Sequence, residues 1–586
     1  MSKIFTNTFK IRIIDSILAY SPSFYMFLGK STPFVDDSLP PVPEDSVDQT
    51  FLNGHDSMIV AKAITLGEVS YMIPRHDWVA NTGYVAYREK SGDLFGNAFY
   101  VSVSSGSGYD VFKCLSNNNT LSTIAPSAVA TSPSDDVYET SDGYQWKYMY
   151  TADNAVVEKF ATRAFLPVIP NADVSGNAVS GAIDYISVEY GGSNYDAYTS
   201  GTLQATAVSG NSLVYTIESS ASSNTNFYVG SAIKIVSGTG AGQQKTITAY
   251  SVSGSTRNVV LDSPFDTQPS TTSMYEITPN VVVVGGGQSC IGRGLVNAAA
   301  SNSIYKVEIS NRGSGYRYGS AFVTGNTGGT TNTAILNVVI SPKGGHGYDP
   351  FRELGAKYLS LTTTFDTTDV EAAGKMLDVN EFRSIGVVVD PIFANVQLTY
   401  TSSTGNFSIG ETVTQSNTGA TGTIVSRATT TLTLTNVLGS FLSGNTTANF
   451  ITGDTSNVTA EVTAVRNNGS DPLAGEILYA NATTRLNVSS MAGSFGADDT
   501  VSFTGNTSTS NAVVYFANTS QVWLVNVKGT IGSNLYSFDN TSSAVIDSII
   551  PPDIIPGTGD IVYLENISPI NKAPGQTETI KAIIEF

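Results

Sequence analysis

Three histidines and two cysteines are the residues of this 586-residue chain best suited to metal binding or nucleophilic chemistry. They are His55, His76, His346, Cys114 and Cys290. No histidine lies within four residues of another or near a cysteine, so the ligand spacing of a metal site is absent. The cysteines are far apart in sequence, which predicts free thiols in a reducing compartment rather than a disulfide framework. We therefore expect no metal and no cofactor.

Adjacent carboxylates offer the main case for catalysis. They occur at Asp135-Asp136 and at Asp498-Asp499. Two carboxyl groups about 5 to 10 Å apart can hydrolyse a glycoside, so a polysaccharide depolymerase is one alternative. Sequence neighbours in loops are more often solvated turn residues, and nothing places such a pair across a cleft. We expect a protein without catalytic residues.

Three other candidates for chemistry are interpreted as structural. His76 and Asp77 are adjacent in "IPRHDW", but neighbours in a strand point to opposite faces and cannot orient each other. The glycine-rich stretches at residues 238–245 and 285–294 lack both the Gly-Lys-Ser/Thr ending of a phosphate loop and a following helix. They are expected to be turns between strands.

The composition excludes some classes of partner. Lys and Arg number 30 against 49 Asp and Glu, which gives a net charge of −19, and no basic stripe is visible. Nucleic-acid binding rests largely on clustered Lys and Arg, so it is not expected. No run of about 18 apolar residues occurs and the N-terminus lacks the features of a signal peptide, which predicts neither membrane insertion nor secretion by that route.

The elements that must position any site are mainly strands. Helical spacing of apolar residues predicts one helix over residues 8–20, and an aromatic strand follows at residues 24–28. Near the other terminus, "IVYLENISPI" and "ETIKAIIEF" have the apolar content and alternation of buried strands. We expect these last strands to pair with strands made much earlier, so that later segments are insertions into an older fold.

Two glycine-rich, weakly charged regions read as insertions, at residues 176–343 and 396–550. In the first, "VEYGGSNY" and "ISNRGSGY" each join a strand to a glycine turn capped by tyrosine, and "ISPKGGHGY" is a looser echo. In the second, "FSIGETV", "FLSGNTT" and "FGADDTV" share Phe at the first position and Thr at the sixth. Their spacing is irregular, which favours degenerate β modules over a solenoid. The tyrosines suit either sugar stacking or hairpin packing.

Outside these regions, the ordered pieces resemble a known family. "FYMFLGKSTPF", "IPRHDW", "YDVFKCL", "DGYQWKYMY", "FRSIGVVVDPI", "GDIVYLENISPI" and "GQTETIKAIIEF" resemble, in the same order, the baseplate wedge subunit encoded by gene eight of T-even-like contractile-tailed bacteriophages. The resemblance covers about residues 1–175, 344–395 and 551–586. It implies a layered β-sandwich fold, a homodimer, and a structural role in viral tail assembly beside other wedge subunits.

The expectation is therefore a mainly β virion protein of the tail baseplate, assembled in the host cytoplasm. Its layered β-sandwich core, with few short helices, is expected in residues 1–175, 344–395 and 551–586, with inserted modules at 176–343 and 396–550. The alternative is a tail adhesin whose modules bind host-surface glycan or a tail fibre. Candidate interface or core anchors are the aromatic residues Phe24, Tyr25, Phe27, Trp78, Trp146 and Tyr563.

Overall fold

The computed structural model confirms a mainly β protein with several sheets, barrel-like arrangements and few short helices. It describes residues 5–20, 24–47, 54–88, 94–127, 137–196, 198–205, 213–325, 333–369, 372, 375–377, 380–394, 396–439, 441–444, 449–467, 478–503, 510–539 and 541–586. The expected helix is present as α1, Asn7–Tyr20. The carboxylates Asp135 and Asp136 lie outside the described residues.

The chain forms two compact units. Unit 1 contains residues 1–11 and 71–357, and unit 2 contains residues 12–70 and 358–586. The predicted core segment 1–175 is thus divided between the units. The reason lies in strand pairing, because its first two strands pair with β22, Asn380–Val389, and β29, Tyr479–Asn481, which come far later in the chain.

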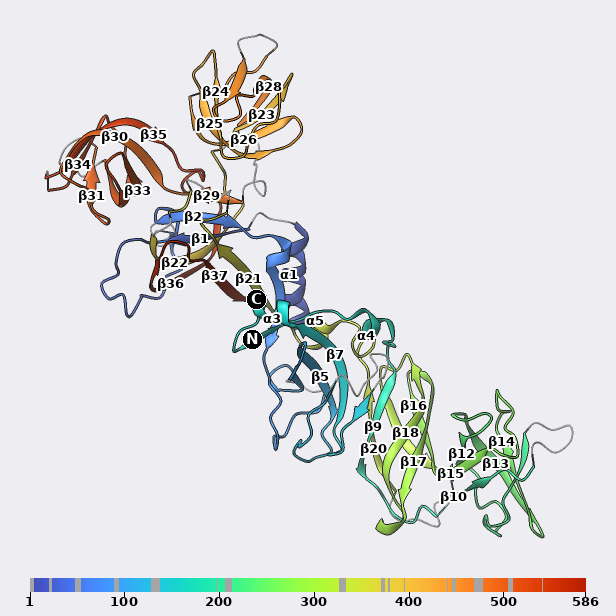
Figure 1. Cartoon of the computed structure of the whole chain (residues 1–586). Helices are drawn as coiled ribbons and strands as arrows, with labels where there is room; N and C mark the ends of the chain where they lie inside the picture. The colour runs from blue at the N-terminus through green and yellow to red at the C-terminus, as the bar shows by residue number, and fades with distance from the viewer. Residues whose placement is uncertain are drawn as a thin grey trace. The chain divides into compact units, whose positions relative to one another are not determined.

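The central sheet of unit 2 is built from five distant segments. Its order is β29-β2-β1-β22-β36, with bounds Tyr479–Asn481 (β29), Met58–Ala63 (β2), Phe24–Gly29 (β1), Asn380–Val389 (β22) and Asp560–Lys572 (β36). Figure 1 shows β1 and β2 from the blue start of the chain beside olive β22 and red β36. The central strand β1 buries five of its six residues, as an aromatic apolar run should when neighbours flank it on both sides.

The last strands return to the early part of unit 2, as expected. Strand β36 pairs antiparallel with β22, which pairs in turn with β1. Strand β37, Glu578–Glu585, pairs along its whole length with β21, Tyr358–Phe365. Pro569 falls where the β36–β22 register shifts, which suits a residue without an N–H group on an edge strand.

The single-turn helix η2, Leu66–Glu68, begins with a capping box from Thr65 and Glu68.

In its described residues, unit 1 combines smaller sheets with three short α-helices, α3 to α5. One sheet has the order β4-β5-β7-β6, with bounds Tyr100–Ser105, Gly108–Ser116, Gln145–Asp153 and Tyr138–Glu139 in that order. Strand β3, Val69–Pro74, pairs with β8, Phe165–Pro167. The helices α3, α4 and α5 span Asn154–Phe160, Ala172–Gly176 and Pro350–Glu353, and Asp153, Asn171 and Asp349 cap their N-termini with side-chain oxygens.

A six-stranded antiparallel sheet completes the described framework of unit 1. Its order is β18-β17-β16-β19-β20-β9, with bounds Ser303–Ser314, Gln288–Asn297, Asn280–Gly285, Gly319–Thr324, Ile335–Ile340 and Ile183–Tyr190. The turn η4, Ala298–Ala300, joins β17 to β18. The predicted glycine-turn tyrosines Tyr195 and Tyr316 are buried, and their hydroxyl groups accept backbone N–H bonds from Ala334 and Cys290. Packing, rather than sugar stacking, is the role of these two rings.

Three six-stranded modules occupy the predicted insertions. The first module contains β10 to β15, with bounds Thr199–Thr202, Val214–Ile217, Ala232–Ser237, Gln244–Ser253, Thr256–Leu261 and Met274–Thr278. The second contains β23 to β28, with bounds Val396–Thr401, Thr412–Gln415, Thr421–Arg427, Thr431–Leu438, Phe450–Gly453 and Thr459–Asn467. The third contains β30 to β35, with bounds Thr484–Ala492, Thr500–Ser502, Asn511–Ala517, Gln521–Lys528, Asn534–Ser537 and Ser543–Ile550.

The three modules share one topology. The second and third are closed barrels in which the strands, numbered within the module, follow the order one, four, three, two, five, six. The first module has the order β11-β14-β13-β12-β15-β10. This is the same order if β11 is counted as the first strand and β10, which precedes it in the chain, is counted as the sixth. It is therefore a circular permutation of the other two.

Backbone hydrogen bonds identify the equivalent positions. Gly230, Gly410 and Asp498 have φ values of 82°, 90° and 69°. The N–H group of each donates a 2.8 Å hydrogen bond to a carbonyl oxygen of the strand that is third in this common numbering. The N–H group of that acceptor residue donates a 2.9 Å bond back, to the carbonyl oxygen of the residue that follows Gly230, Gly410 or Asp498. Phe407 and Phe495 occupy equivalent positions, each three residues before the turn residue Gly410 or Asp498. Phe441 does not, because it lies between the fourth and fifth strands of the second module, so "FLSGNTT" is not structurally equivalent to the other two stretches.

The chain returns to the central sheet between the second and third modules. Strand β29 pairs with β2, so the predicted insertion 396–550 contains a strand of the core. Likewise the region 176–343 contains both the six-stranded sheet of unit 1 and the first module. The boundaries of the predicted wedge core remain a prediction.

Ala582 tests whether β37 is an integral strand. Its side chain is 2% exposed and it pairs with Leu361. Ala582→Asp should lower the free energy of unfolding of unit 2 by about 3 kcal/mol or more, because it buries a carboxylate. Thr579→Asp on the exposed side of the same strand is the control and should change it by about 0.5 kcal/mol or less. Urea unfolding followed by hydrogen exchange of β21 measures both, and equal effects would contradict a buried β37.

Candidate functional site

The residues singled out for metal or acid–base chemistry are not brought together. Asp77 accepts hydrogen bonds from Arg75 Nε at 2.8 Å and from Ser102 Oγ at 2.7 Å, while the ring of His76 packs on Tyr100. The structure thus directs Asp77 away from His76. Across the described ranges, no three His, Cys, Asp or Glu side chains are grouped so as to hold a metal ion.

The cysteines and the glycine-rich stretches have structural positions. Cys114 is buried and Cys290 is partly buried, and both are free thiols. Burial raises the pKa of Cys290 to about 12 and that of Cys114 further, which disfavours a reactive thiolate. The stretch 238–245 is a turn that leads into strand β13, as predicted. In the stretch 285–294 only Gly286 and Gly287 form the turn between β16 and β17, and residues 288–294 belong to strand β17, so the prediction of a turn holds there only in part.

Three of the six predicted aromatic anchors are core residues. The side chains of Tyr25, Phe27 and Trp146 are fully buried. Tyr25 and Phe27 belong to the core of the central sheet of unit 2, and Trp146 packs in a cluster around strands β5 and β7 of unit 1. These three rings therefore serve folding and are closed to a partner.

The other three predicted anchors are partly exposed. Trp78 donates a hydrogen bond from Nε1 to Ser122 Oγ over 3.0 Å. Tyr563 on the edge strand β36 donates its hydroxyl group to Glu565, and burial followed by this bond raises its pKa. Phe24 lies at the start of β1 and lines a cavity. These positions leave an interface role open for each.

An apolar hollow lies in unit 2, where the last strands meet α1. Its volume is about 500 Å³. The lining comes from α1, β1, β21, β22, β36, β37 and the terminal residue, namely Ser16, Ile17, Phe24, Leu359, Leu361, Val389, Val562, Ile584 and Phe586. Val562 is 51% exposed at this edge. An open cavity lined so uniformly by apolar side chains suits an apolar side chain of another protein.

A buried ion cluster in unit 1 joins residues far apart in sequence. Lys113 on β5 donates to Glu353 at the end of α5, and both side chains are at most 5% exposed. The carboxylate of Glu353 also accepts the N–H group of Gly347. His346 is fully buried, with its ring nitrogens 3.8 Å from Asp184 and 3.9 Å from Glu353. The cluster ties the sheet of β5 to the segment that follows β20.

Burial and charge set the protonation of this cluster. Burial, the largest single influence, raises the pKa of Glu353, but the charge of Lys113 and the interactions with His346 together outweigh burial and hold the pKa at about 2. Burial, reinforced by the charge of Lys113, lowers the pKa of His346 below its usual value. At neutral pH the imidazole of His346 is therefore neutral and the carboxyl group of Glu353 is ionised. Burial lowers the pKa of Lys113, and the charge of Glu353 opposes that change.

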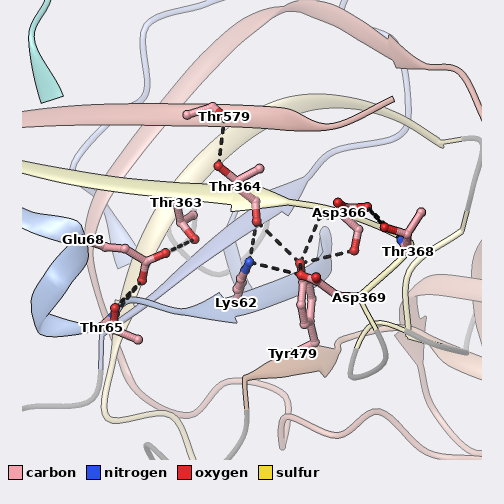
Figure 2. A network of polar contacts seen from close by, with 10 residues as sticks. All are labelled: Lys62, Thr65, Glu68, Thr363, Thr364, Asp366, Thr368, Asp369, Tyr479 and Thr579. Atoms are coloured by element: carbon pink, nitrogen blue, oxygen red, sulfur yellow. Dashed lines mark hydrogen bonds and ion pairs between the residues drawn. The ribbon is translucent and has the colours of Figure 1, made fainter. Parts of the chain in front are cut away.

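A second polar network holds strand β29 in the central sheet of unit 2. Figure 2 shows Lys62 of β2, Thr364 of β21 and Tyr479 of β29 turned toward one another. Lys62 Nζ lies 2.5 Å from the carbonyl oxygen of Thr364 and 3.6 Å from Asp369. The Tyr479 hydroxyl group donates to Asp369 over 2.6 Å and accepts the N–H group of Asp366 over 3.1 Å. Burial, followed by the bond to Asp369, raises the pKa of Tyr479.

A buried ion pair completes the attachment of β29. Lys375 Nζ lies 3.3 Å from Asp553 Oδ2 and donates over 2.7 Å to the carbonyl oxygen of Tyr479. Asp553 in turn accepts the N–H group of Asn481 over 2.8 Å. Both charged side chains are 2% exposed. The short strand between the second and third modules is thus fixed at both its ends by charge-assisted bonds.

Sequence reasoning missed both networks. Their members are separated by tens to hundreds of residues, and no local pattern marks Lys375 as buried. The one usable signal was an apolar strand that contains a lysine, as in "MIVAKAI" and "YDVFKCL". A lysine flanked by buried strand residues requires a partner, although the sequence does not say which.

Comparisons with known proteins identify no relative. No protein-family model matches the chain, and no curated protein matches it. In the part of the chain that the structure describes, no helix has the length and apolar character needed to cross a membrane.

The buried pair Lys113–Glu353 yields a stability prediction. Lys113→Met should lower the free energy of unfolding of unit 1 by about 3–5 kcal/mol, because it leaves the Glu353 carboxylate buried without its counter-ion. The double variant Lys113→Met, Glu353→Gln should recover part of that loss. Chemical unfolding of both variants measures the difference, and a double variant less stable than the single one would contradict the ion-pair assignment.

The lowered pKa of Glu353 yields a pH prediction. Its folded-state pKa of about 2 lies below the ordinary value of 4.5, so its stabilising effect is complete above pH 4.5 and is lost as the pH falls toward 2. Glu353→Gln should remove about 3 kcal/mol of that decline in the free energy of unfolding. Exposed Asp173→Asn is the control and should leave the decline as steep as in the unaltered protein.

Proposed function

We propose that this chain is a structural, non-catalytic subunit of the baseplate wedge of a contractile phage tail. It would form a homodimer, bind other wedge subunits, and be assembled into the virion in the host cytoplasm. The ordered sequence resemblance described above suggests the family. The structural observation that supports it is the return of β36 and β37 to the sheet and strand pair of β1, β22 and β21.

The apolar cavity of unit 2 is the surface best suited to such a partner. It lies beside the edge strand β36 and contains the exposed Val562 and the terminal Phe586. Permanent interfaces bury roughly 2,000 Å² or more and are anchored by a few apolar or aromatic side chains in pockets. The proposed interface places an apolar side chain of a neighbouring wedge subunit in this cavity.

The mechanism of a wedge subunit is mechanical. Buried ion pairs and paired strands keep each unit rigid, while surfaces such as the cavity form contacts that differ between the assembled states of a tail before and after contraction. The energy that favours one state is the difference in contact free energy between the two arrangements.

Val562→Asp tests this proposal. The charge should weaken association of the purified chain with the other wedge subunits of the same phage by roughly 10- to 30-fold, because it is placed in an apolar cavity at an interface. Leu66→Asp is the control, since Leu66 is 76% exposed in the same unit and does not line the cavity. Co-sedimentation and titration measure association. Failure of the unaltered chain to bind any wedge subunit would contradict the proposed function.

A second candidate function is a tail adhesin whose modules bind host-surface glycan. The observation that favours it is a polar hollow of about 530 Å³ in the third module, which contains the exposed ring of Phe538. The two functions are compatible, because a baseplate subunit can carry binding modules outside its core.

A further inference from the structure

The third module carries a polar hollow beside an exposed aromatic ring. The hollow is lined by the loop before β31 and the turn between β34 and β35, namely Ser494, Asp498, Asp499, Thr500, Ser537, Phe538, Asp539 and Thr541. Phe538 is 47% exposed. An exposed ring next to carboxylate and hydroxyl groups offers an apolar face and hydrogen-bond acceptors together, within the roughly 300–1,000 Å³ of typical ligand sites.

A second hollow adjoins the first at Asp498. Its volume is about 230 Å³, and it is lined by residues of β22, β32, β36 and the segment after β1, including Ser31 and Tyr515. The side chains of both are more than nine-tenths buried, and neither Ser31 Oγ nor Tyr515 Oη has a hydrogen-bond partner among the described residues. Buried hydroxyl groups are normally paired, so these two indicate a place where a ligand or bound water supplies the missing bonds.

Comparison with the second module shows what is special about this hollow. Glu411 and Asp499 occupy equivalent positions, and each accepts the N–H group of the residue three places before it over 2.6 Å. Glu411 also reaches the opposite turn, where it accepts the N–H groups of Thr455 at 3.2 Å and Ser456 at 2.8 Å. Its longer side chain fills the space. Asp499 is one methylene shorter and leaves the corresponding space in the third module open.

The residue before Asp499 also distinguishes the third module from the other two. The first two modules have Gly230 and Gly410 in the left-handed conformation, whereas the third has Asp498 with φ 69°. A non-glycine residue there costs backbone energy, and such strain is retained where the side chain has a use. No described residue donates a hydrogen bond to the Asp498 carboxylate, and its only described neighbours of opposite charge are Arg383 and Lys30.

We propose that the third module binds a saccharide in this pair of hollows. The sugar ring lies against Phe538, and its hydroxyl groups donate to Asp498 and Asp499. In the adjoining hollow, further hydroxyl groups pair with Ser31 and Tyr515. This inference rests on the adhesin candidate and names its site.

A saccharide fits better than a basic peptide. A sugar hydroxyl group both donates and accepts, so it can satisfy the hydroxyl groups of Ser31 and Tyr515, whereas a lysine ammonium only donates. Asp539 Oδ1 already accepts three hydrogen bonds from Ser537 and Thr541, and Asp499 Oδ2 accepts one from Gly496. The Asp498 carboxylate and the second oxygen of Asp499 are therefore the acceptors that we assign to the sugar. The exposed ring of Phe538 supplies the apolar contact that the CH face of a sugar requires.

The test uses the full-length chain on an array of bacterial surface polysaccharides, followed by calorimetric titration of a retained oligosaccharide. Phe538→Ala and Asp498→Gly should each weaken its binding by roughly 10- to 100-fold. Asp498→Gly restores the residue of the other modules, so its unfolding temperature should be unchanged or higher, which separates lost binding from misfolding. Asp499→Glu should also weaken binding by filling the hollow. Leu442→Ala, an exposed site in the second module, should have no effect.

The contrary outcomes are distinct. Retention of no saccharide overturns both the adhesin function and this site. If the Phe538→Ala and Asp498→Gly variants still retain the saccharide, the proposed site is wrong and the glycan binds elsewhere on the chain. A third outcome is that no saccharide is retained but a tetralysine peptide binds. If this peptide binding is lost in Asp498→Gly and unaffected by Phe538→Ala, the ligand is a basic partner and not a saccharide.

Discussion

The pairing of β36 with β22 is the constraint on which unit 2 depends. The central sheet draws its strands from five segments, and the last of them lies near the C-terminus. The backbone groups of β22 require partners on both sides because the strand is largely buried. The sheet therefore cannot be completed until almost the whole chain is available. Loop-closure entropy rises slowly with loop length, which is why two large modules can lie between β22 and β36 at modest thermodynamic cost.

Buried charges locate the strands that hydrophobic packing alone would leave ambiguous. Strand β29 has only three residues, and all three are buried, so the alternation of buried and exposed faces that usually fixes the register of a strand is absent. The bonds from Lys375 and Asp553 to the backbone of Tyr479 and Asn481 act on the strand directly, so a shifted register would cost both buried charged groups these hydrogen bonds. The same reasoning applies to Lys113 and Glu353 in unit 1. These pairs define a unique arrangement more than they add to its stability.

The fold class and the return of the C-terminal strands could be predicted because they follow from local alternation of apolar residues. The helix at Asn7–Tyr20 and the turn before β13 were equally local. The division into two units and the presence of β29 in the core could not be predicted, because three residues of strand carry too little pattern. The candidate site was partly visible, since Asp498-Asp499 was recognised as a pair. Its setting emerged only when equivalent turns could be superimposed by their hydrogen bonds, which showed that Phe495 aligns with Phe407 and that Phe441 does not.

The circular permutation of the first module has a consequence for how such a protein changes over time. In every module the first and last strands in chain order are neighbours: β10 beside β15, β23 beside β28, and β30 beside β35. The chain thus enters and leaves each module at one seam, so a whole cassette can be gained, lost or exchanged by recombination while the strands that flank it keep their partners. A lineage that carries this chain could therefore exchange one cassette without rebuilding the body that bears it.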